Sequence, residues 1–351
     1  MNFDMTDDRR MLSDSLTRFL SEQYGIEHRN KVAYSAPFHD PAKWEAMVEL
    51  GLLYALAPED QGGMGGTGFD ILCAFEPLGQ ALCPEPMLAS LMALRLMTAV
   101  GADIDPLLTG ETRYGVGIGE IDAPYELQDI QTEAKSGKLT GRKSVVYSGA
   151  DAERFLIAAR HEGKLALYDL AASDAQIMGY GMIDGGSAAE VLLEDSPATL
   201  LLKDAEPALE AALDAGRLAL CAEAVGAMDT LYAACVDYLK TRRQFGKPIA
   251  SFQALQHRMI DLQIEIEQAR SITIRAADAL DTAAGPRAIA MAKNLVGRAA
   301  RLVAEETIQM QGGIGVTWEY PSAHYAKRLV MIDHQLGDTD YHLERVIALG
   351  T

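Results

Sequence analysis

Two arginines beside an aromatic residue stand in a turn between two long helical patterns of this 351-residue chain. The segment Lys240–Met259, KTRRQFGKPIASFQALQHRM, places Arg242 and Arg243 next to Phe245 and Gly246. Guanidinium groups fork onto phosphate and a Phe ring packs on another ring, so the segment suits a planar cofactor that carries phosphate. Taken alone, it fits more simply a helix end where arginines offset the dipole and Gly246 makes the turn.

A second segment, Gln309–Pro321, reads QMQGGIGVTWEYP. Paired glycines let backbone amides approach a ligand closely. The simpler interpretation is that Gly312 and Gly313 end the preceding helix.

A third segment, His334–Arg345, crowds together acidic and imidazole side chains in HQLGDTDYHLER. A metal site is conceivable, but no spacing typical of a metal-binding motif is present. The favoured interpretation is a polar loop in which Asp338 caps the last helix, and we expect no metal.

The hydrophobic pattern predicts a mostly α protein with a central β domain. Helical periodicity holds over residues 1–104, interrupted by the glycine-rich stretch Pro58–Gly68, which cannot be helix. Short strand-like runs over residues 105–205 predict a small antiparallel barrel or sandwich. Broad apolar stripes over residues 206–351 predict a C-terminal bundle of long helices. A groove where three such domains meet is a usual place for a cofactor.

Composition excludes several classes of protein. Hydrophobic residues make up 49% of the chain, which allows a large core, and the net charge of -19 disfavours general nucleic-acid binding. Four cysteines without CxxC spacing predict buried thiols rather than disulfides or a zinc site. The acidic start lacks an apolar leader, and Met87–Gly101 is too short to span a bilayer, so we expect a soluble cytoplasmic protein.

Taken together, these segments resemble the acyl-CoA dehydrogenase flavoprotein family over nearly the whole chain. WEAMVELGLLYALAPEDQGGMGG resembles the family's glycine-rich loop between helices, and GKLTGRKSVVYSGADAERFLIAAR is similar to its β-domain stretch. RRQFGKPIASFQALQHRMIDL and QMQGGIGVTWEYP are close matches at a spacing that we know in no other family.

The resemblance implies a helical domain, a β-barrel and a four-helix bundle, usually as a tetramer of paired dimers. It implies non-covalent FAD and α,β-dehydrogenation of an acyl-CoA substrate, with hydride passing to flavin N5. It also implies an electron-transfer flavoprotein as the acceptor of electrons from the reduced flavin. Matched by position, the expected FAD contacts are Arg242, Gln244, Phe245 and Gln253, then Gln309, Gly312 and Gly313, and, along the flavin ring, Val146, Tyr147 and Ser148.

The family's catalytic base has no counterpart at either of its usual positions. In the C-terminal loop, Leu336 or Gly337 stands where a Glu is expected, and the alternative position on the first long bundle helix is Gly216. The neighbouring Arg217 is expected to contact substrate. Three hypotheses follow.

The first hypothesis is that another carboxylate is the base, with Asp338 first and Asp340 or Glu223 as alternatives. The second is that the chain pairs with a homologous, Glu-bearing subunit in a heteromer and supplies part of the FAD site, whereas the first would suit a homodimer or homotetramer. The third is that the fold serves flavin chemistry that needs no such base.

Overall fold

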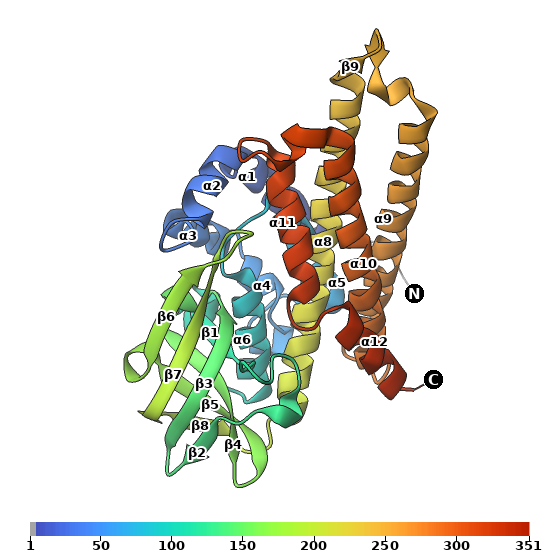
Figure 1. Ribbon diagram of the computed structural model, residues 1–351. Coiled ribbons are helices and arrows are strands. Elements are labelled where there is room, and N and C mark those ends of the chain that lie inside the picture. The colour runs from blue at the N-terminus through green and yellow to red at the C-terminus, as the bar shows by residue number, and fades with distance from the viewer. Residues whose placement is uncertain (1–4, 351) are drawn as a thin grey trace. The chain divides into compact units, whose positions relative to one another are not determined.

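The computed structural model describes residues 5–350 and divides into two compact units, each assembled from segments distant in sequence. The helical unit comprises the residues up to Glu27, Gly68–Cys83 and everything from Arg217 onward. The β-containing unit comprises His28–Thr67 and Pro84–Gly216. The domain boundaries expected after residues 104 and 205 stay a prediction. In chain order, the β-containing unit's strands fall between Tyr114 and Leu202, and long helices precede and follow them (Figure 1).

The helices and strands match the expected texture, with some short elements in addition. The helices are α1 (Asp7–Gln23), α2 (Ile26–Ala33), α3 (Pro41–Glu49), α4 (Leu52–Ala55), α5 (Gly68–Ala81), α6 (Met87–Ala99), α7 (Asp105–Leu108), α8 (Glu206–Thr241), α9 (Gln253–Ala279), α10 (Gly285–Gln311), α11 (Pro321–His334) and α12 (Thr339–Ala348). The strands of the large sheet are β1 (Tyr114–Gly117), β2 (Glu133–Lys135), β3 (Lys138–Tyr147), β4 (Arg154–His161), β5 (Lys164–Ala171), β6 (Gln176–Gly181), β7 (Ser187–Pro197) and β8 (Thr199–Leu202). The stretch Pro58–Gly68, expected to lack helix, contains the single 3-10 turn Glu59–Gln61.

In the helical unit, α10 packs against α9, α11 and α12 (Figure 1). Pro286 stands in its first turn, where its missing N–H costs nothing, and Gly312 ends it with a positive φ of 69°. Both ends therefore form where the sequence predicted them.

Close backbone contact between α5 and α8 depends on two glycines. A Cβ placed on Gly79 would lie 1.9 Å from the Glu223 carbonyl oxygen, and one on Gly226 would lie 2.0 Å from the Glu76 carbonyl oxygen. The helices can approach this closely only because neither position carries a side chain. This crossing fixes Glu223, a candidate base, against α5.

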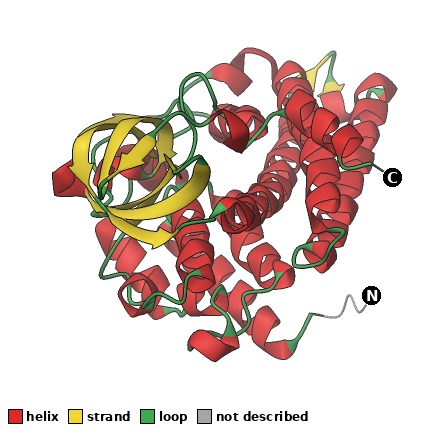
Figure 2. Cartoon of the chain, turned by 90° about the horizontal axis from the view of Figure 1, so that it is seen from below, coloured by secondary structure: helices red, strands yellow, loops and turns green. Residues whose placement is uncertain are grey.

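The large sheet has the strand order β6-β7-β3-β2-β4-β5-β8, with β1 added beside β4. Most neighbours are antiparallel as expected, but β1 and β2 each pair with β4 in parallel. The sequence patterns did not reveal β2, β6 or β8, because β2 and β8 are short and β6 carries little hydrophobic signal. Figure 2 shows the strands curling around a common interior.

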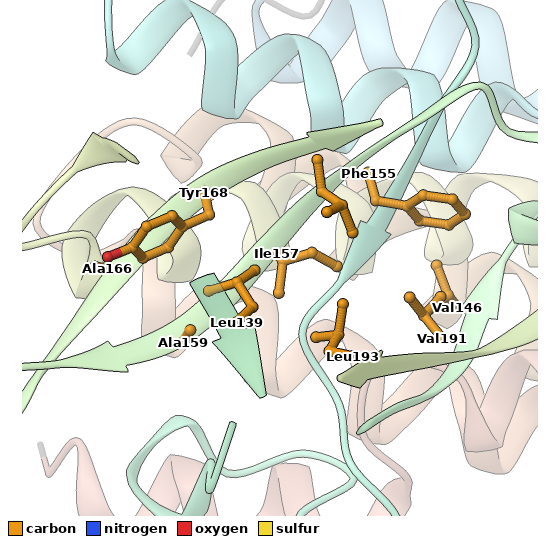
Figure 3. Packing of buried hydrophobic residues seen from close by; sticks show 10 residues of the cluster. Leu139, Val146, Phe155, Ile157, Ala159, Ala166, Tyr168, Val191 and Leu193 are labelled. Carbon is orange, nitrogen blue, oxygen red and sulfur yellow. The ribbon is translucent and has the colours of Figure 1, made fainter. Parts of the chain in front are cut away.

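That interior holds ten buried residues contributed by β3, β4, β5 and β7 (Figure 3). Phe155, Ile157 and Tyr168 are among the largest of them, with aliphatic side chains filling the remaining space. Val146, near the end of β3, is one of this set, so the core extends to the segment expected at the flavin.

Helix α8 is long and apolar enough to cross a membrane, which the sequence analysis overlooked. Its most apolar 18-residue window is 67% buried within the protein, as in the core helix of a soluble protein. Length and composition alone are therefore weak evidence for a membrane span.

Candidate functional site

The loop between α11 and α12 is the place where the resemblance puts the family's base. Its residues Leu336 and Gly337 have positive φ angles of 55° and 108°. Asp338 follows as the N-cap of α12, and its Oδ1 accepts a hydrogen bond from the Tyr341 amide at 2.8 Å. The simpler interpretation of Asp338, a helix cap, is therefore what the side chain does here.

Three basic side chains hold the carbonyl groups of this loop. Lys293 Nζ donates to the carbonyl oxygens of Ile332, Asp333 and Gly337 at 2.7, 3.1 and 3.0 Å. Arg217 Nε donates to the Leu336 carbonyl oxygen at 3.0 Å, and His342 Nε2 contacts the same oxygen at 3.2 Å. The loop is thus fixed through its backbone from α8, α10 and α12.

Burial governs the protonation of two of these groups. Desolvation lowers the pKa of Lys293 to about 8, and nearby acidic groups only partly oppose it. Desolvation, followed by the positive charges of Arg217 and Lys293, lowers the pKa of His342 to about 2. His342 is therefore a neutral imidazole at physiological pH and is not a general base for a proton released near pH 7.

Gly337 has no room for a side chain. A Cβ built there would lie 2.4 Å from Tyr341 Cδ1 and 2.6 Å from His342 Nε2. Its φ of 108° also lies in the region that L residues rarely adopt. A Glu at this position would need a different loop.

Glu223 is held by an arginine. Arg328 Nε and Nη2 donate to its two carboxylate oxygens at 2.6 and 2.7 Å, and Arg328 Nη1 donates to Gln335 Oε1 at 3.0 Å. A bidentate pair of this kind directs the carboxylate at its partner rather than at a substrate. Asp340, the remaining alternative, is exposed in the first turn of α12.

The arginine–phenylalanine segment forms a small hairpin of β9 (Arg243–Gln244) and β10 (Lys247–Pro248) between α8 and α9 (Figure 1). Phe245, at its tip with a φ of 52°, is 90% exposed and contacts Phe252 edge-on. Arg242 and Gln244 are also exposed. Gln253 is exposed at the first residue of α9. Such a protruding aromatic ring is available to a ligand or to another protein chain.

The glycine pair begins a 3-10 turn, Gly312–Val316, at the end of α10. A Cβ at Gly312 or Gly313 would meet nothing within 4 Å, and Gln309 beside them is exposed. Gln311 is only 3% exposed, and neither atom of its amide has a hydrogen-bond partner among the described residues. A buried amide without partners is costly and points to a missing water or ligand.

The three residues expected along the flavin ring differ in burial. The Val146 side chain points into the sheet core at 2% exposure, so only its backbone can face a ligand (Figure 3). Tyr147 and Ser148 are half-buried, and Ser148 has a φ of 57°. Gly216 and Arg217 are consecutive buried residues of α8, where Arg217 binds the 335–338 loop. Its expected contact with substrate stays a prediction.

The remaining expectations concern metal and thiol chemistry. Within residues 5–350, no three His, Cys, Asp or Glu side chains gather as a metal site would require. The four cysteines are free thiols, and Cys73, Cys221 and Cys235 are buried. Lys293 was not recognised from the sequence, because a lysine in an amphipathic helix gives no signal of its three carbonyl partners.

Comparisons with known proteins identify the family to which these features belong. The sequence model described as "Acyl-CoA dehydrogenase, N-terminal domain" matches residues 6–103, and that described as "Acyl-CoA dehydrogenase, C-terminal domain" matches residues 207–348. The chain belongs to the acyl-CoA dehydrogenase family. It is therefore related to FAD-dependent oxidoreductases, as the two sequence matches had indicated.

Three relatives illustrate the breadth of the match. Acyl-CoA dehydrogenase FadE34 of Mycobacterium tuberculosis is 31% identical over 93% of this chain, which spans only 44% of that longer protein. Acyl-CoA dehydrogenase IpdE2 of Mycolicibacterium smegmatis is 29% identical, covering 98% of this chain and 99% of the relative. A solved structure of a Tcur3481-Tcur3483 steroid ACAD variant superposes with a TM-score of 0.89 at 26% identity, covering 98% of this chain and 97% of that one.

The residues present fit the cofactor of an acyl-CoA dehydrogenase. Gln311 offers an unsatisfied donor and acceptor beside two glycines whose backbone is open to close approach. Arg242 has an exposed guanidinium group, of the kind that binds phosphate, and Phe245 has an exposed ring. When bound, FAD supplies the acceptor for hydride from the acyl Cβ.

Proposed function

We propose that this chain is an FAD-binding subunit of an acyl-CoA dehydrogenase whose catalytic base comes from a homologous chain. The observation that carries the proposal is the closed loop at Gly337. Gly337, one of the two loop positions at which the resemblance places the family's Glu, has no side chain and no space for one.

The other carboxylates support the same proposal. Asp338 caps α12, and Glu223 is bound by Nε and Nη2 of Arg328. Removal of a Cα proton needs a base within hydrogen-bond reach of it, together with donors that stabilise the developing oxyanion. A Glu-bearing partner would supply the base.

The subunit assembly and the electron acceptor that we propose are those that the family resemblance implies. The name of the similar solved structure joins two designations, Tcur3481 and Tcur3483, and this favours a heteromer for this chain also. Exposed apolar side chains on α9, Ile260 and Ile264, suit burial against another subunit, and a heterotetramer is the assembly we propose. An electron-transfer flavoprotein would reoxidise the flavin, and we place the complex in the cytoplasm.

A homomeric enzyme that uses Asp338 is the second candidate. One observation favours it: Asp338 is half-buried, and its capping bond engages only Oδ1. Because Asp is shorter than Glu, this base would need substrate to approach the backbone more closely.

Assembly separates the two candidates. The chain is expressed alone and together with a homologous chain that carries the family's Glu, and each preparation is analysed for mass and bound flavin. The proposal expects a mixed complex that holds FAD more tightly than this chain alone. A stable homotetramer that ignores the second chain and is inactivated by Asp338→Asn would establish the second candidate instead.

A further inference from the structure

Strand β3 contains a bulge next to the segment expected at the flavin. Its pairing with β7 runs from Lys143↔Val191 directly to Val146↔Ala189, so Ser144 and Val145 together oppose one residue, Glu190. Val145 has a φ of 51°, which is unfavourable for a β-branched side chain. Strain of this kind persists only where surrounding contacts enforce it.

The Glu190 carboxylate supplies those contacts. Its Oε1 accepts from the Val145 amide at 3.3 Å, from Ser144 Oγ at 2.9 Å and from the Tyr180 hydroxyl at 3.2 Å. Arg142 Nε donates to Oε2 at 2.9 Å. Although burial opposes ionisation, these hydrogen bonds leave the pKa of Glu190 below its usual value, so the acceptor is charged at neutral pH.

A second anchor holds the bulge at the opposite edge of β3. The Ser144 amide donates to the Gly119 carbonyl oxygen at 3.0 Å. Lys143, fully buried, donates from Nζ to Glu120 Oε1 at 2.6 Å and to the Ile118 carbonyl oxygen at 3.0 Å. The bulge is therefore fixed from both sides, and the strain at Val145 is enforced.

The bulge sets which way the following residues face. Val145 is 40% exposed, whereas Val146 lies in the sheet core (Figure 3). Without the extra residue, the alternation of β3 would be shifted by one and these orientations would exchange. The segment Val145–Ser148 thus owes its presentation to the bulge.

We propose that Glu190 is a positioning residue of the flavin site. Its carboxylate fixes the strained Val145 backbone and so presents Tyr147 and Ser148 to the cofactor ring. This inference rests on the proposed function, because it takes Val145–Ser148 as the flavin-facing segment.

Hydrogen exchange of the whole protein without added FAD tests the positioning step. Amides of residues 144–148 are compared in wild type, Glu190→Ala, Glu190→Gln and Glu190→Asp. Gln keeps the reach of the side chain without its charge, and Asp keeps the charge but is shorter. If the bulge is held because the side chain at position 190 reaches the Val145 amide, hydrogen exchange of residues 144–148 accelerates about tenfold or more in the Ala and Asp variants. In the Gln variant it accelerates much less.

Flavin binding by the same proteins tests the connection to the site. We expect the Ala and Asp variants to release FAD about tenfold faster than wild type and to shift its visible absorption, with smaller changes for Gln. Tyr180→Phe is the matched control: it removes one donor to the same carboxylate without touching Val145, and should behave as wild type.

The outcomes separate the two proposals. If FAD binds neither to the wild-type chain alone nor to its complex with the Glu-bearing chain, the proposed function is overturned, whatever the exchange data show. Wild-type protein that binds FAD, with unchanged exchange and release in the Asp and Ala variants, overturns the role of Glu190. Should the Ala variant fail to fold, the difference between Asp and Gln decides, and equal behaviour of these two contradicts the inference.

Discussion

Lys293 Nζ lies 3.0 Å from the carbonyl oxygen of Gly337 and binds two further carbonyls at the end of α11. One buried lysine on α10 thereby fixes the loop at which the resemblance places the family's base. The backbone is held in place at Gly337, where a side chain would overlap Tyr341 and His342.

Substitution of Gly337 should destabilise the fold without adding activity. In Gly337→Ala, a Cβ would overlap Tyr341 and His342 at a φ of 108°, so we expect a loss of about 2 kcal/mol or more in unfolding free energy. Gly313→Ala, with nothing within 4 Å, is the matched control and should change little. Gly337→Glu should give no dehydrogenation by the chain alone, and a gain of turnover would show that the loop can open.

Loss of the Lys293 ammonium should loosen the same loop. Lys293→Met leaves three buried carbonyls without their donor, and we expect about 3 kcal/mol of destabilisation in urea unfolding. The exposed Lys240→Met serves as control and should lie within about 0.5 kcal/mol of wild type. Equal stability of the two variants would show that the bonds from Lys293 to the three carbonyl groups do not stabilise the loop.

The lowered pKa of Lys293, about 8, also predicts a pH dependence. Its ordinary value is about 10.4, so between these pH values the unfolded chain holds a proton that the folded chain has released. The unfolded state binds more protons there, and folding stability contributed by this group rises with pH. The unfolding free energy of wild type should therefore rise relative to that of Lys293→Met from pH 8 to pH 10. A difference between the two that does not change with pH would contradict the lowered pKa of Lys293.

His39 should give the opposite trend near neutrality. Its Nδ1 lies 3.1 Å from Glu85 Oε2 and its Nε2 lies 2.9 Å from Asp151 Oδ2, while Arg113 pairs with Asp151 from the other side. Burial opposes the charge, but the two carboxylates raise the pKa of His39 above its usual value.

The stabilisation by His39 is then complete below about pH 6.5 and is lost as pH rises through the folded-state pKa. We expect the stability difference between wild type and His39→Gln to shrink from pH 6 to pH 9. A difference that grows with pH would contradict the assignment.

The crossing of α5 and α8 should tolerate no methyl group. Gly79→Ala would place a carbon 1.9 Å from the Glu223 carbonyl oxygen, so the helices must separate, at a cost of about 3 kcal/mol in chemical denaturation. Gly25→Ala, with open space around it, should be neutral. Comparable midpoints for the two variants would show that the crossing adapts freely.

Sequence patterns predicted the long elements well, because their signals are local. The stripes of α8, α9 and α10 and the glycine that ends α10 are properties of neighbouring residues. The parallel pairing of β1 and β2 with β4 was not predicted, since strand direction depends on partners distant in the chain.

For the candidate site too, features that depend on neighbouring residues were predicted and those that depend on distant residues were not. Asp338 was expected either as the base or as a helix cap, and its side chain caps α12; its role as a base stays a prediction. The burial of Val146 and the occupation of Glu223 by Arg328 could not be predicted, because a bulge and an ion pair across 105 residues leave no local pattern.

Anaerobic mixing of the FAD-loaded chain with acyl-CoA thioesters tests the central claim most directly. Straight-chain, branched and steroid side-chain thioesters are each added while flavin absorbance is followed. We predict that the chain alone keeps its flavin oxidised and that the complex with a homologous Glu-bearing chain is reduced. Rapid reduction of the chain alone would contradict the account, because it would require a carboxylate of this chain, such as Asp338, to act as the base.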